Sequence, residues 1–478
     1  MRKNTAVWMV LLLAVAGYLR LWNLGAKSLW ADEAISAALA SATRADFWRI
    51  VLHREANMAF YYLLLRIWNV VGSSEFALRS LSVLAGVLAV PLLYGLGCQV
   101  FDPRTGRISA LFLALSPLHI AYSQEARSYG FLILFSVLAT SLLLMCCEKP
   151  AKSWYLYIVA SVVGLYSHVM FGLTLIGHSS AVGFSSELRT RSRNFLAALG
   201  AVAVLALPLA YWLFAQGSHL GWIKESPIQL LAAFFSGLAG PKGKALLLAY
   251  VLLIACGLLL AKPSLPNRGS RVLWASLWAP VLLTCAMSWR IPFLVPRYLS
   301  ACLPPFLLLA ARGAALLPNR WWLLSGLGIM VSLSLQQDFL YQRLRADSFY
   351  SDDWRGAVHS LMLRTEPGDS LLFPYAFERV PAQYYLNREA AAGRQHLEVL
   401  FPAGSVPQLL SAEMPELGAE GLQSLASRTG RVWTLSAIAP NEHLQRVELG
   451  LQRHCVREVE EHFGSVRLER KLCRPELR

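Results

Sequence analysis

The stretch "TAVWMVLLLAVAGYLRLWNLGAKSLWADEAIS" (residues 5–36) decides how the rest of the chain is interpreted. Its first part, residues 5–24, holds roughly twenty residues and one charge, Arg20, enough to cross a hydrocarbon core of about 30 Å at about 1.5 Å per residue. Two adjacent acids, Asp32 and Glu33, follow soon after this run ends. A membrane span followed by paired carboxylates indicates a membrane protein with a polar site at the membrane edge.

The composition agrees with a chain that lies mostly in lipid. Hydrophobic residues make up 56% of the sequence and charged residues only 15%, against about 25% charged residues in soluble proteins. The basic start, "MRKN", also suits a signal peptide, but no small-residue cleavage site follows, so we expect an uncleaved signal-anchor. The net charge of +15 is concentrated in short connectors between apolar runs, so it indicates membrane orientation and no nucleic-acid partner.

About eleven membrane crossings are expected. The short basic connectors between apolar runs are cytoplasmic by the positive-inside rule. The stretch at 58–72 is only about fifteen residues long and contains Arg66, so we expect an interfacial or re-entrant helix on the outer surface. Two amphipathic helices, "AISAALASATR" and "DFWRIVLHRE", are expected before it in the membrane plane. The apolar runs after the first lie at about 80–100, 108–123, 130–147, 154–167, 169–184, 195–214, 245–261, 272–289, 298–311 and 321–335.

The unusual polar residues of the chain all fall on the outer face in this arrangement. The basic connectors determine this orientation without reference to these residues, so their gathering on one side is independent support. Ionisable residues that meet at one membrane face indicate a functional site. They are Asp32, Glu33, Glu55, Glu125, Arg127, His168 and Arg297.

These residue types together suit one kind of chemistry. A carboxylate near a low-dielectric boundary has its pKa raised by desolvation, which favours general-base catalysis near neutral pH. An arginine at the membrane edge, such as Arg297, can hold a phosphate through two hydrogen bonds and neutralise a leaving group. An acid that deprotonates a hydroxyl and an arginine that holds a departing phosphate describe glycosyl transfer from a lipid-phosphate sugar.

Each of these residues also has a simpler interpretation. Asp32 can cap a helix that begins one residue later, and Arg297 can be a basic residue at the lipid headgroup level. His168 can be an ordinary interfacial histidine. With Glu125 or Glu55, His168 can also bind a divalent metal, although no tight ligand spacing is present.

Five segments, in chain order, are similar to one known family. They are "SLWADEAIS", "FYYLLLRIWNVVGSSEFALRSLSVLAGVL", "ALSPLHIAYSQEARSYGFLIL", "LYSHVMF" and "VPRYLSACLPPFLLLAARG". They resemble the dolichyl- or polyprenyl-phosphate-sugar-dependent glycosyltransferases of the GT-C fold. The nearest branch comprises bacterial relatives of protein O-mannosyltransferases and of the aminoarabinose transferase that acts on lipid A. The resemblance covers roughly residues 1–335.

The resemblance implies roles for individual residues. It implies a catalytic base at Asp32, with Glu33 helping to orient the acceptor, and a donor site that contains Glu125 and Arg127. Inversion at the anomeric carbon is implied as well. The other implied site residues are Arg297 and Tyr298 for the lipid phosphate, and Glu55, Asn57, Tyr61 and His168 for the acceptor or for support of the site.

One departure from the family pattern concerns the acceptor side. The family often has His-Pro-Pro ahead of the Tyr-Tyr-Leu-Leu-Leu run, whereas Asn57, Met58 and Ala59 precede Phe60 here. The resemblance therefore implies neither an acceptor specificity nor a histidine-based metal site, and a divalent metal is the one cofactor left open.

The chain turns polar after the last apolar run. This change predicts a catalytic membrane domain over 1–335 and a C-terminal α/β domain over 336–478. Cys455 and Cys473 are the two cysteines of this polar tail. They can form a disulfide if the tail lies outside the cytoplasm.

The tail contains clear local patterns. A helix is expected in "SDDWRGAVHSLMLRTEPGD", with Ser351 as its N-cap. Strands are expected at "SLLFPYAF", "HLEVLF" and "RVWTLSAI", and "VRLERKL" alternates as an edge strand does. A helix that includes Leu444, Val447, Leu451, Cys455 and Val459 is expected just before this last strand.

The sequence thus predicts a polytopic α-helical membrane protein of the GT-C type, with outer juxtamembrane helices in 25–79 and a C-terminal α/β domain. The predicted activity moves a sugar, a mannose-like hexose or a modified pentose, from a polyprenyl-phosphate donor to a hydroxyl of a glycan, lipid or protein. The expected location is the bacterial inner membrane, with the site and the C-terminal domain in the periplasm.

Two other classes of protein fit the sequence less well. A multi-pass transporter or flippase for a lipid-linked sugar would carry ionisable residues near span midpoints, often with internal repeats. The predicted spans are nearly free of charge and show no repeat. A membrane-anchored sensor would need only one or two spans.

Overall fold

The computed structural model describes residues 2–148, 150–216, 226–261, 268–290, 295–347, 352–393, 397–411, 417, 430–437 and 442–473. The chain folds into two compact units. Unit 1 comprises Met1–Leu24, Glu55–Leu64 and Arg79–Gln342, and unit 2 comprises Gly25–Arg54, Leu65–Leu78 and Arg343–Arg478. Each unit therefore combines segments that are distant in the sequence.

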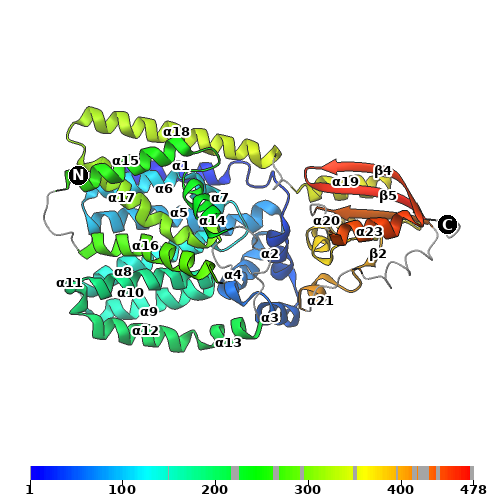
Figure 1. Ribbon diagram of the computed structural model, residues 1–478, viewed down its shortest axis with the longest axis horizontal. Helices are drawn as coiled ribbons and strands as arrows, with labels where there is room; N and C mark the ends of the chain where they lie inside the picture. The colour runs from blue at the N-terminus through cyan, green and yellow to red at the C-terminus, as the bar shows by residue number, and fades with distance from the viewer. Residues whose placement is uncertain are drawn as a thin grey trace. The chain divides into compact units, whose positions relative to one another are not determined.

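Unit 1 is built from helices (Figure 1), most of them apolar. Neighbouring pairs include α8 with α9, α10 with α16, and α15 with α17. The helices are α1 (Arg2–Leu21), α5 (Glu75–Val100), α6 (Pro103–Ala114), α7 (Pro117–Ser123), α8 (Tyr129–Glu148), α9 (Pro150–Ser167), α10 (Gly172–Phe184), α11 (Ser186–Arg189), α12 (Ser192–Leu205), α13 (Leu207–Gln216), α14 (Pro227–Gly237), α15 (Lys244–Leu260), α16 (Arg268–Ser288), α17 (Leu303–Leu316) and α18 (Arg320–Asp347). Short 3₁₀ turns, η1 (Ala56–Met58), η3 (Val169–Phe171) and η4 (Pro296–Cys302), and the start of α4 (Ala59–Trp68) complete this unit.

Several of these helices meet the length and composition of a membrane span. Among the residues that the structure describes, six helices qualify alone, and α12 with α13 makes a seventh if this pair, bent by 51°, is one span. Four shorter apolar helices lie within Ser153–Ser167, Val169–Phe184, Pro227–Gly237 and Lys244–Leu260. The expectation of a multi-span membrane protein is confirmed, and the number of eleven crossings stays a prediction.

Prolines interrupt two of the expected runs. The run expected at 108–123 is two helices, because α6 ends at Ala114 and α7 starts at Pro117, with the Ser116 side chain accepting a hydrogen bond from the His119 backbone N–H. The second interruption is Pro208, near the bend between α12 and α13. Proline has no N–H to donate within a helix, so both breaks follow from the sequence.

Close helix packing depends on small residues. Helices α15 and α17 approach each other at Gly257 and Gly313. A Cβ added to Gly313 would lie 1.6 Å from the carbonyl oxygen of Leu253, so any larger residue would force the two helices apart. Such glycines allow membrane helices to approach through backbone contact.

The two short helices expected before the 58–72 stretch are present in unit 2. They are α2 (Ala31–Ser41) and α3 (Arg44–His53). Thr43 caps α3 by accepting a hydrogen bond from the Asp46 backbone N–H at 3.2 Å. Helix α4, within the 58–72 stretch, has only ten residues, which is shorter than a bilayer crossing needs.

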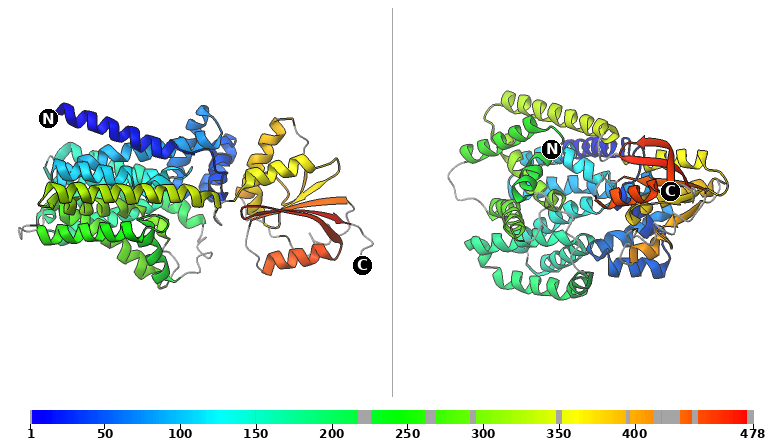
Figure 2. Two further views of the ribbon diagram at one scale, coloured as in Figure 1. Left: turned by 90° about the horizontal axis from the view of Figure 1, so that it is seen from above. Right: turned by 45° about the vertical axis from the view of Figure 1, so that its right-hand side comes forward.

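The C-terminal part of unit 2 is a five-stranded sheet with the order β2-β1-β3-β5-β4. Strand β1 is parallel to β2 and β3, while β5 is antiparallel to β3 and β4. Helices α19 and α20 cover one face and α23 covers the other (Figure 2). The elements are α19 (Trp354–Arg364), β1 (Ser370–Leu372), η5 (Ala376–Glu378), α20 (Arg379–Ala391), β2 (Glu398–Phe401), α21 (Val406–Ser411), β3 (Gly430–Ser436), α23 (Glu442–Gln452), β4 (Cys455–Phe463) and β5 (Val466–Cys473).

The predicted disulfide between Cys455 and Cys473 is present and joins β4 to β5. The prediction of a helix that extends through Cys455 to Val459 was wrong. The helix ends at Gln452, and the chain from Cys455 onward is strand β4. Helical spacing continued to Val459 only by coincidence, because pairing with β5 determines the backbone there.

Two other details of the tail differ from expectation. Strand β5 was expected at an edge but lies between β3 and β4. Its alternation has another cause, since the face opposite Leu468 carries a buried ion pair between Glu469 and Lys471. Ser351, the expected N-cap of α19, lies outside the described residues, and Asp353 caps this helix by accepting from the Gly356 N–H.

Candidate functional site

Arg127 anchors a polar cluster in unit 1. It lies between α7 and α8 and is buried. Its Nη1 donates a hydrogen bond to the Tyr62 hydroxyl at 2.9 Å, and this hydroxyl donates to Glu55 Oε2 at 2.7 Å. The backbone is held too, because Ser82 Oγ donates to the Arg127 carbonyl at 2.9 Å. Arg127 is therefore fixed at both ends and linked to an acid through a hydroxyl.

His168 lies in the turn between α9 and η3 and brings two arginines into the same neighbourhood. Its Nδ1 accepts a hydrogen bond from the Met170 N–H at 3.1 Å, which caps η3. Burial lowers the pKa of His168 to about 3, and the positive charges of Arg127 and Arg297 contribute to this shift. The imidazole is therefore neutral near pH 7 and lies within electrostatic reach of both guanidiniums.

Aromatic rings surround this histidine. The ring centroids of Tyr129 and Tyr298 lie 5.5 and 6.0 Å from that of His168. The Arg297 guanidinium lies over the Tyr298 ring, 6.0 Å from its centroid. Sugars and phosphates suit such surroundings, because rings offer flat contact surfaces and guanidiniums offer paired donors.

Glu125 belongs to the same neighbourhood as Arg297. Both charges act on the Tyr122 hydroxyl, and the Tyr122 ring lies 5.0 Å from the Tyr129 ring, measured between centroids. The structure thus brings together six of the predicted residues within unit 1: Glu55, Glu125, Arg127, His168, Arg297 and Tyr298.

Tyr61 and Asn57 lie beside this cluster with contacts of their own. The Tyr61 hydroxyl is 3.3 Å from Ser82 Oγ, and its ring packs edge-to-face against Tyr62 and Phe131. The Asn57 Oδ1 is buried and has no hydrogen-bond partner among the described residues. Tyr62, the residue next to Tyr61, makes hydrogen bonds to Arg127 and Glu55, and the sequence analysis missed it.

Asp32 and Glu33 belong to unit 2, in the first turn of α2. Glu33 is buried and Asp32 is partly buried. The interpretation of Asp32 as a helix cap was wrong, because Trp30 occupies the N-cap position and Asp32 is inside the helix. The catalytic roles of both acids stay predictions.

A second buried cluster was missed by the sequence analysis. Arg20 Nη2 lies 2.7 Å from His119 Nδ1, and Arg20 also donates to the carbonyls of Leu113 and Ala114 at 3.0 Å. The charge of Asp338, in α18, acts on Arg20. The sequence predicts that Asp338 belongs to the tail, because the last apolar run ends near 335, whereas α18 continues to Asp347.

Metal binding was left open by the sequence. In the part of the chain that the structure describes, no group of three or more His, Cys, Asp or Glu side chains has the arrangement of a metal site.

Comparison with protein families gives one match. Residues 55–214 match the family described as "Dolichyl-phosphate-mannose-protein mannosyltransferase". No curated protein sequence matches the chain. The matched segment contains the Arg127 and His168 parts of the cluster and ends before Arg297.

Solved structures with the same fold cover almost the whole chain. ArnT from Cupriavidus metallidurans in the apo state is 13% identical, with a TM-score of 0.68 and coverage of 98% of each chain. The same protein bound to undecaprenyl phosphate is 12% identical, with a TM-score of 0.65 and coverage of 97% of this chain and 98% of that one. The archaeal oligosaccharyltransferase AglB from Archaeoglobus fulgidus is 10% identical, with a TM-score of 0.51 and coverage of 90% and 69%.

These matches confirm two predictions from the sequence. The chain has the GT-C fold with a C-terminal sheet domain, and it resembles the polyprenyl-phosphate-dependent glycosyltransferases. The matched family and AglB both carry the names of sugar-transferring enzymes, in agreement with the predicted enzyme class.

Proposed function

We propose that this protein is a membrane glycosyltransferase that moves one sugar from a polyprenyl-phosphate donor to an acceptor hydroxyl. One observation carries the proposal: Arg127 and Arg297, distant in the sequence, both act electrostatically on His168, and Arg297 lies over Tyr298, whose ring neighbours that of His168. Two guanidiniums beside an uncharged imidazole and tyrosine rings favour binding of an anion that also presents a sugar.

The comparisons support a lipid phosphate as this anion. ArnT, which shares the fold, has been solved with undecaprenyl phosphate bound, and the matched family is described as using dolichyl-phosphate-mannose. Both names describe a sugar carrier with a single phosphate on a polyprenyl chain. We place the reaction on the outer side of a bacterial inner membrane, because the positive-inside rule puts the basic connectors in the cytoplasm.

The proposed reaction is a single displacement. The Asp32 carboxylate takes the proton of the acceptor hydroxyl, whose oxygen attacks the anomeric carbon of the donor sugar. A new glycosidic bond forms as the bond between that carbon and the phosphate oxygen breaks, and the polyprenyl phosphate leaves with the electron pair. Arg127 and Arg297 stabilise the charge that develops on the departing phosphate. Attack opposite the leaving group inverts the anomeric carbon.

Reconstitution tests this proposal. The full-length protein in liposomes is supplied with undecaprenyl-phosphate mannose or undecaprenyl-phosphate aminoarabinose, together with a bacterial envelope extract as acceptor. We expect donor consumption, release of undecaprenyl phosphate and a glycosylated product in mass spectra with one of the two donors. Asp32→Asn should abolish transfer while donor binding persists. Asp46→Asn, the same change in the neighbouring helix α3, is the matched control and should retain activity.

Two results would overturn the proposal. One is full activity of Asp32→Asn, which would exclude the assigned base. The other is movement of intact donor across the bilayer without cleavage, which is the behaviour of a flippase.

A further inference from the structure

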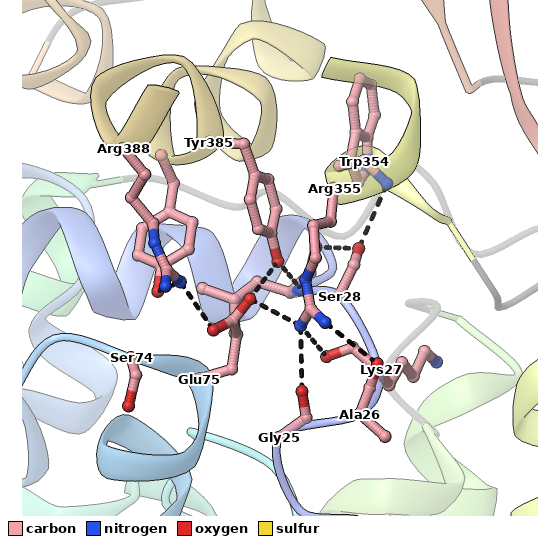
Figure 3. A network of polar contacts seen from close by, with 12 residues as sticks. Gly25, Ala26, Lys27, Ser28, Ser74, Glu75, Trp354, Arg355, Tyr385 and Arg388 are labelled. Carbon is pink, nitrogen blue, oxygen red and sulfur yellow. Dashed lines mark hydrogen bonds and ion pairs between the residues drawn. The ribbon is translucent and has the colours of Figure 1, made fainter. Parts of the chain in front are cut away.

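Residues just ahead of Asp32 are held by hydrogen bonds to the C-terminal domain, all within unit 2 (Figure 3). The Leu29 N–H donates to the Tyr385 hydroxyl at 2.7 Å. Ser28 Oγ donates to the Asp352 carbonyl at 2.6 Å and accepts from the Trp354 N–H at 3.2 Å. Leu29 is fully buried, so its position is fixed by packing as well as by hydrogen bonds.

Arg355, in α19, holds the preceding residues of the same segment. Its Nη2 donates to the carbonyls of Gly25 at 3.0 Å and Lys27 at 3.4 Å, and its Nη1 donates to that of Ala26 at 3.4 Å. One rigid guanidinium thus binds three successive carbonyl groups, which a flexible lysine could not reproduce in the same geometry.

Glu75 connects Arg355 with Tyr385. Its Oε1 accepts from Arg355 at 2.6 Å and from the Tyr385 hydroxyl at 3.1 Å, while its Oε2 accepts from Arg388 at 2.7 Å (Figure 3). The carboxylate is buried. A buried carboxylate with three donors is strongly oriented, and it orients its donors in turn.

The Tyr385 hydroxyl can donate one hydrogen bond and accept another at the same time. Burial, together with the charge of Glu75, raises the pKa of Tyr385, so the hydroxyl keeps its proton at neutral pH. It donates that proton to Glu75 and accepts from Leu29. A phenylalanine at this position would keep the packing and lose both hydrogen bonds.

The start of α2 lacks the usual local means of orientation. Trp30 occupies its N-cap position, and an indole N–H donates only, so it cannot supply the accepting oxygen of a capping residue. Helix α2 also packs against α20, the helix that carries Tyr385. The segment before α2 and its packing against α20 therefore help to set the direction in which α2 begins.

We propose that Tyr385 and Arg355 are positioning residues for Asp32, and that the C-terminal domain is part of the catalytic apparatus through them. Asp32 lies three positions beyond Leu29, within one helical turn, so a shift at 25–29 moves its carboxylate directly. A misplacement of about 1 Å can reduce the rate by about 100-fold. This inference rests on the proposed function of Asp32.

Arg388 provides a matched control. It binds the same Glu75 carboxylate and stacks over Tyr384, with its guanidinium 5.6 Å from the ring centroid. Its described hydrogen bonds go to Glu75 and Tyr384 and none goes to 25–29. Its removal weakens the network without releasing the segment ahead of Asp32.

The test compares Tyr385→Phe, Arg355→Gln, Arg388→Gln and Asp32→Asn in the full-length protein. Turnover number and KM for the active undecaprenyl-phosphate sugar are measured with thermal unfolding and hydrogen exchange over residues 25–41. We expect the first two variants to lower kcat about 10-fold or more, with donor KM within about 2-fold and faster exchange at 25–41. Arg388→Gln should keep kcat within about 2-fold.

The outcomes separate this inference from the proposed function. If Asp32→Asn is inactive while Tyr385→Phe and Arg355→Gln turn over normally, the positioning role is wrong and the proposed function stands. Equal losses of kcat and thermal stability in all three network variants, Arg388→Gln included, would show a purely structural role and overturn the inference. Activity in Asp32→Asn would overturn both.

Discussion

Each of the two units has a pair of arginines near one buried side chain. That side chain is a carboxylate, Glu75, in unit 2 and an imidazole, His168, in unit 1. In unit 2, Arg355 and Arg388 bind the Glu75 carboxylate directly, at 2.6 and 2.7 Å. In unit 1, Arg127 and Arg297 lie near the neutral imidazole of His168, and Arg127 reaches Glu55 through the Tyr62 hydroxyl. The first pair binds one carboxylate directly. The described contacts of the second pair are with aromatic rings and a tyrosine hydroxyl.

This difference indicates that one cluster has a structural role and the other a ligand-binding role. A buried carboxylate held directly by two cations fixes the chain segments that carry them. Cations beside neutral rings and hydroxyls suit an anion that arrives with a ligand. We therefore expect changes in the unit 1 pair to alter donor affinity, and changes around Glu75 to alter geometry and stability.

The largest expected effect is that of Asp32→Asn. Loss of a general base typically costs between about 10²- and 10⁴-fold, so we expect kcat to fall about 10³-fold with donor binding retained. Single-turnover kinetics with radiolabelled donor measures this loss. Loss of donor binding, rather than of turnover, in Asp32→Asn would contradict the assignment of donor binding to the arginines of unit 1.

The next largest effect is expected for Arg127→Gln and Arg297→Gln. A hydrogen bond to a charged group contributes about 1.5–3 kcal/mol, so each change should raise the donor KM by about 10- to 100-fold. Titration with undecaprenyl-phosphate sugars measures it, and Arg388→Gln is the control from unit 2. An unchanged KM in both unit 1 variants would contradict the assignment of the two clusters.

Glu75→Gln should act on stability. The change removes the charge of a buried carboxylate, but its partners Arg355 and Arg388 are 41% and 51% exposed and can be solvated. We therefore expect about 1–2 kcal/mol of destabilisation, at the low end for buried ion pairs. Thermal unfolding of the full-length protein checks this value, and donor KM should not change.

The smallest effect concerns the pH dependence of His168. With a pKa of about 3, the imidazole stays neutral from pH 5 upward. The contribution of neutral His168 to the free energy of unfolding is fully present above the pKa of about 6.5 that histidine has in the unfolded chain. This contribution is lost as the pH falls toward 3. In His168→Asn we expect the limbs of the pH profile of kcat/KM to move by less than about 0.3 units, because another group sets them. A larger shift would show that His168 titrates during turnover.

Much of the site in unit 1 could be predicted from the sequence. Charged side chains are rare in a chain this apolar, so Glu125, Arg127 and Arg297 are conspicuous, and the basic connectors predict that they lie on one face. Tyr62 was missed because a tyrosine beside another tyrosine in an apolar helix carries no such signal. Only packing shows that its hydroxyl faces Arg127.

The Glu75 network could not be predicted from the sequence. Its members come from the first connector, from the start of α5 and from two helices of the tail. Glutamate and arginine are ordinary residues in polar segments, so nothing marks Glu75, Arg355 and Arg388 as partners. The prediction of a helix through Cys455 and Val459 was wrong for a similar reason. Strand β4 depends on pairing with β5 and on the disulfide, rather than on local periodicity.

The sequence by itself determined that the chain is a multi-span membrane protein and which charges stand out within it. Hydrophobicity and charge are properties of single residues, and the bilayer sorts them without reference to the rest of the fold. Tertiary structure alone decided that one histidine has two arginines nearby and that the tail holds the segment ahead of Asp32. These arrangements depend on contacts between segments that are tens to hundreds of residues apart, for which no local pattern exists.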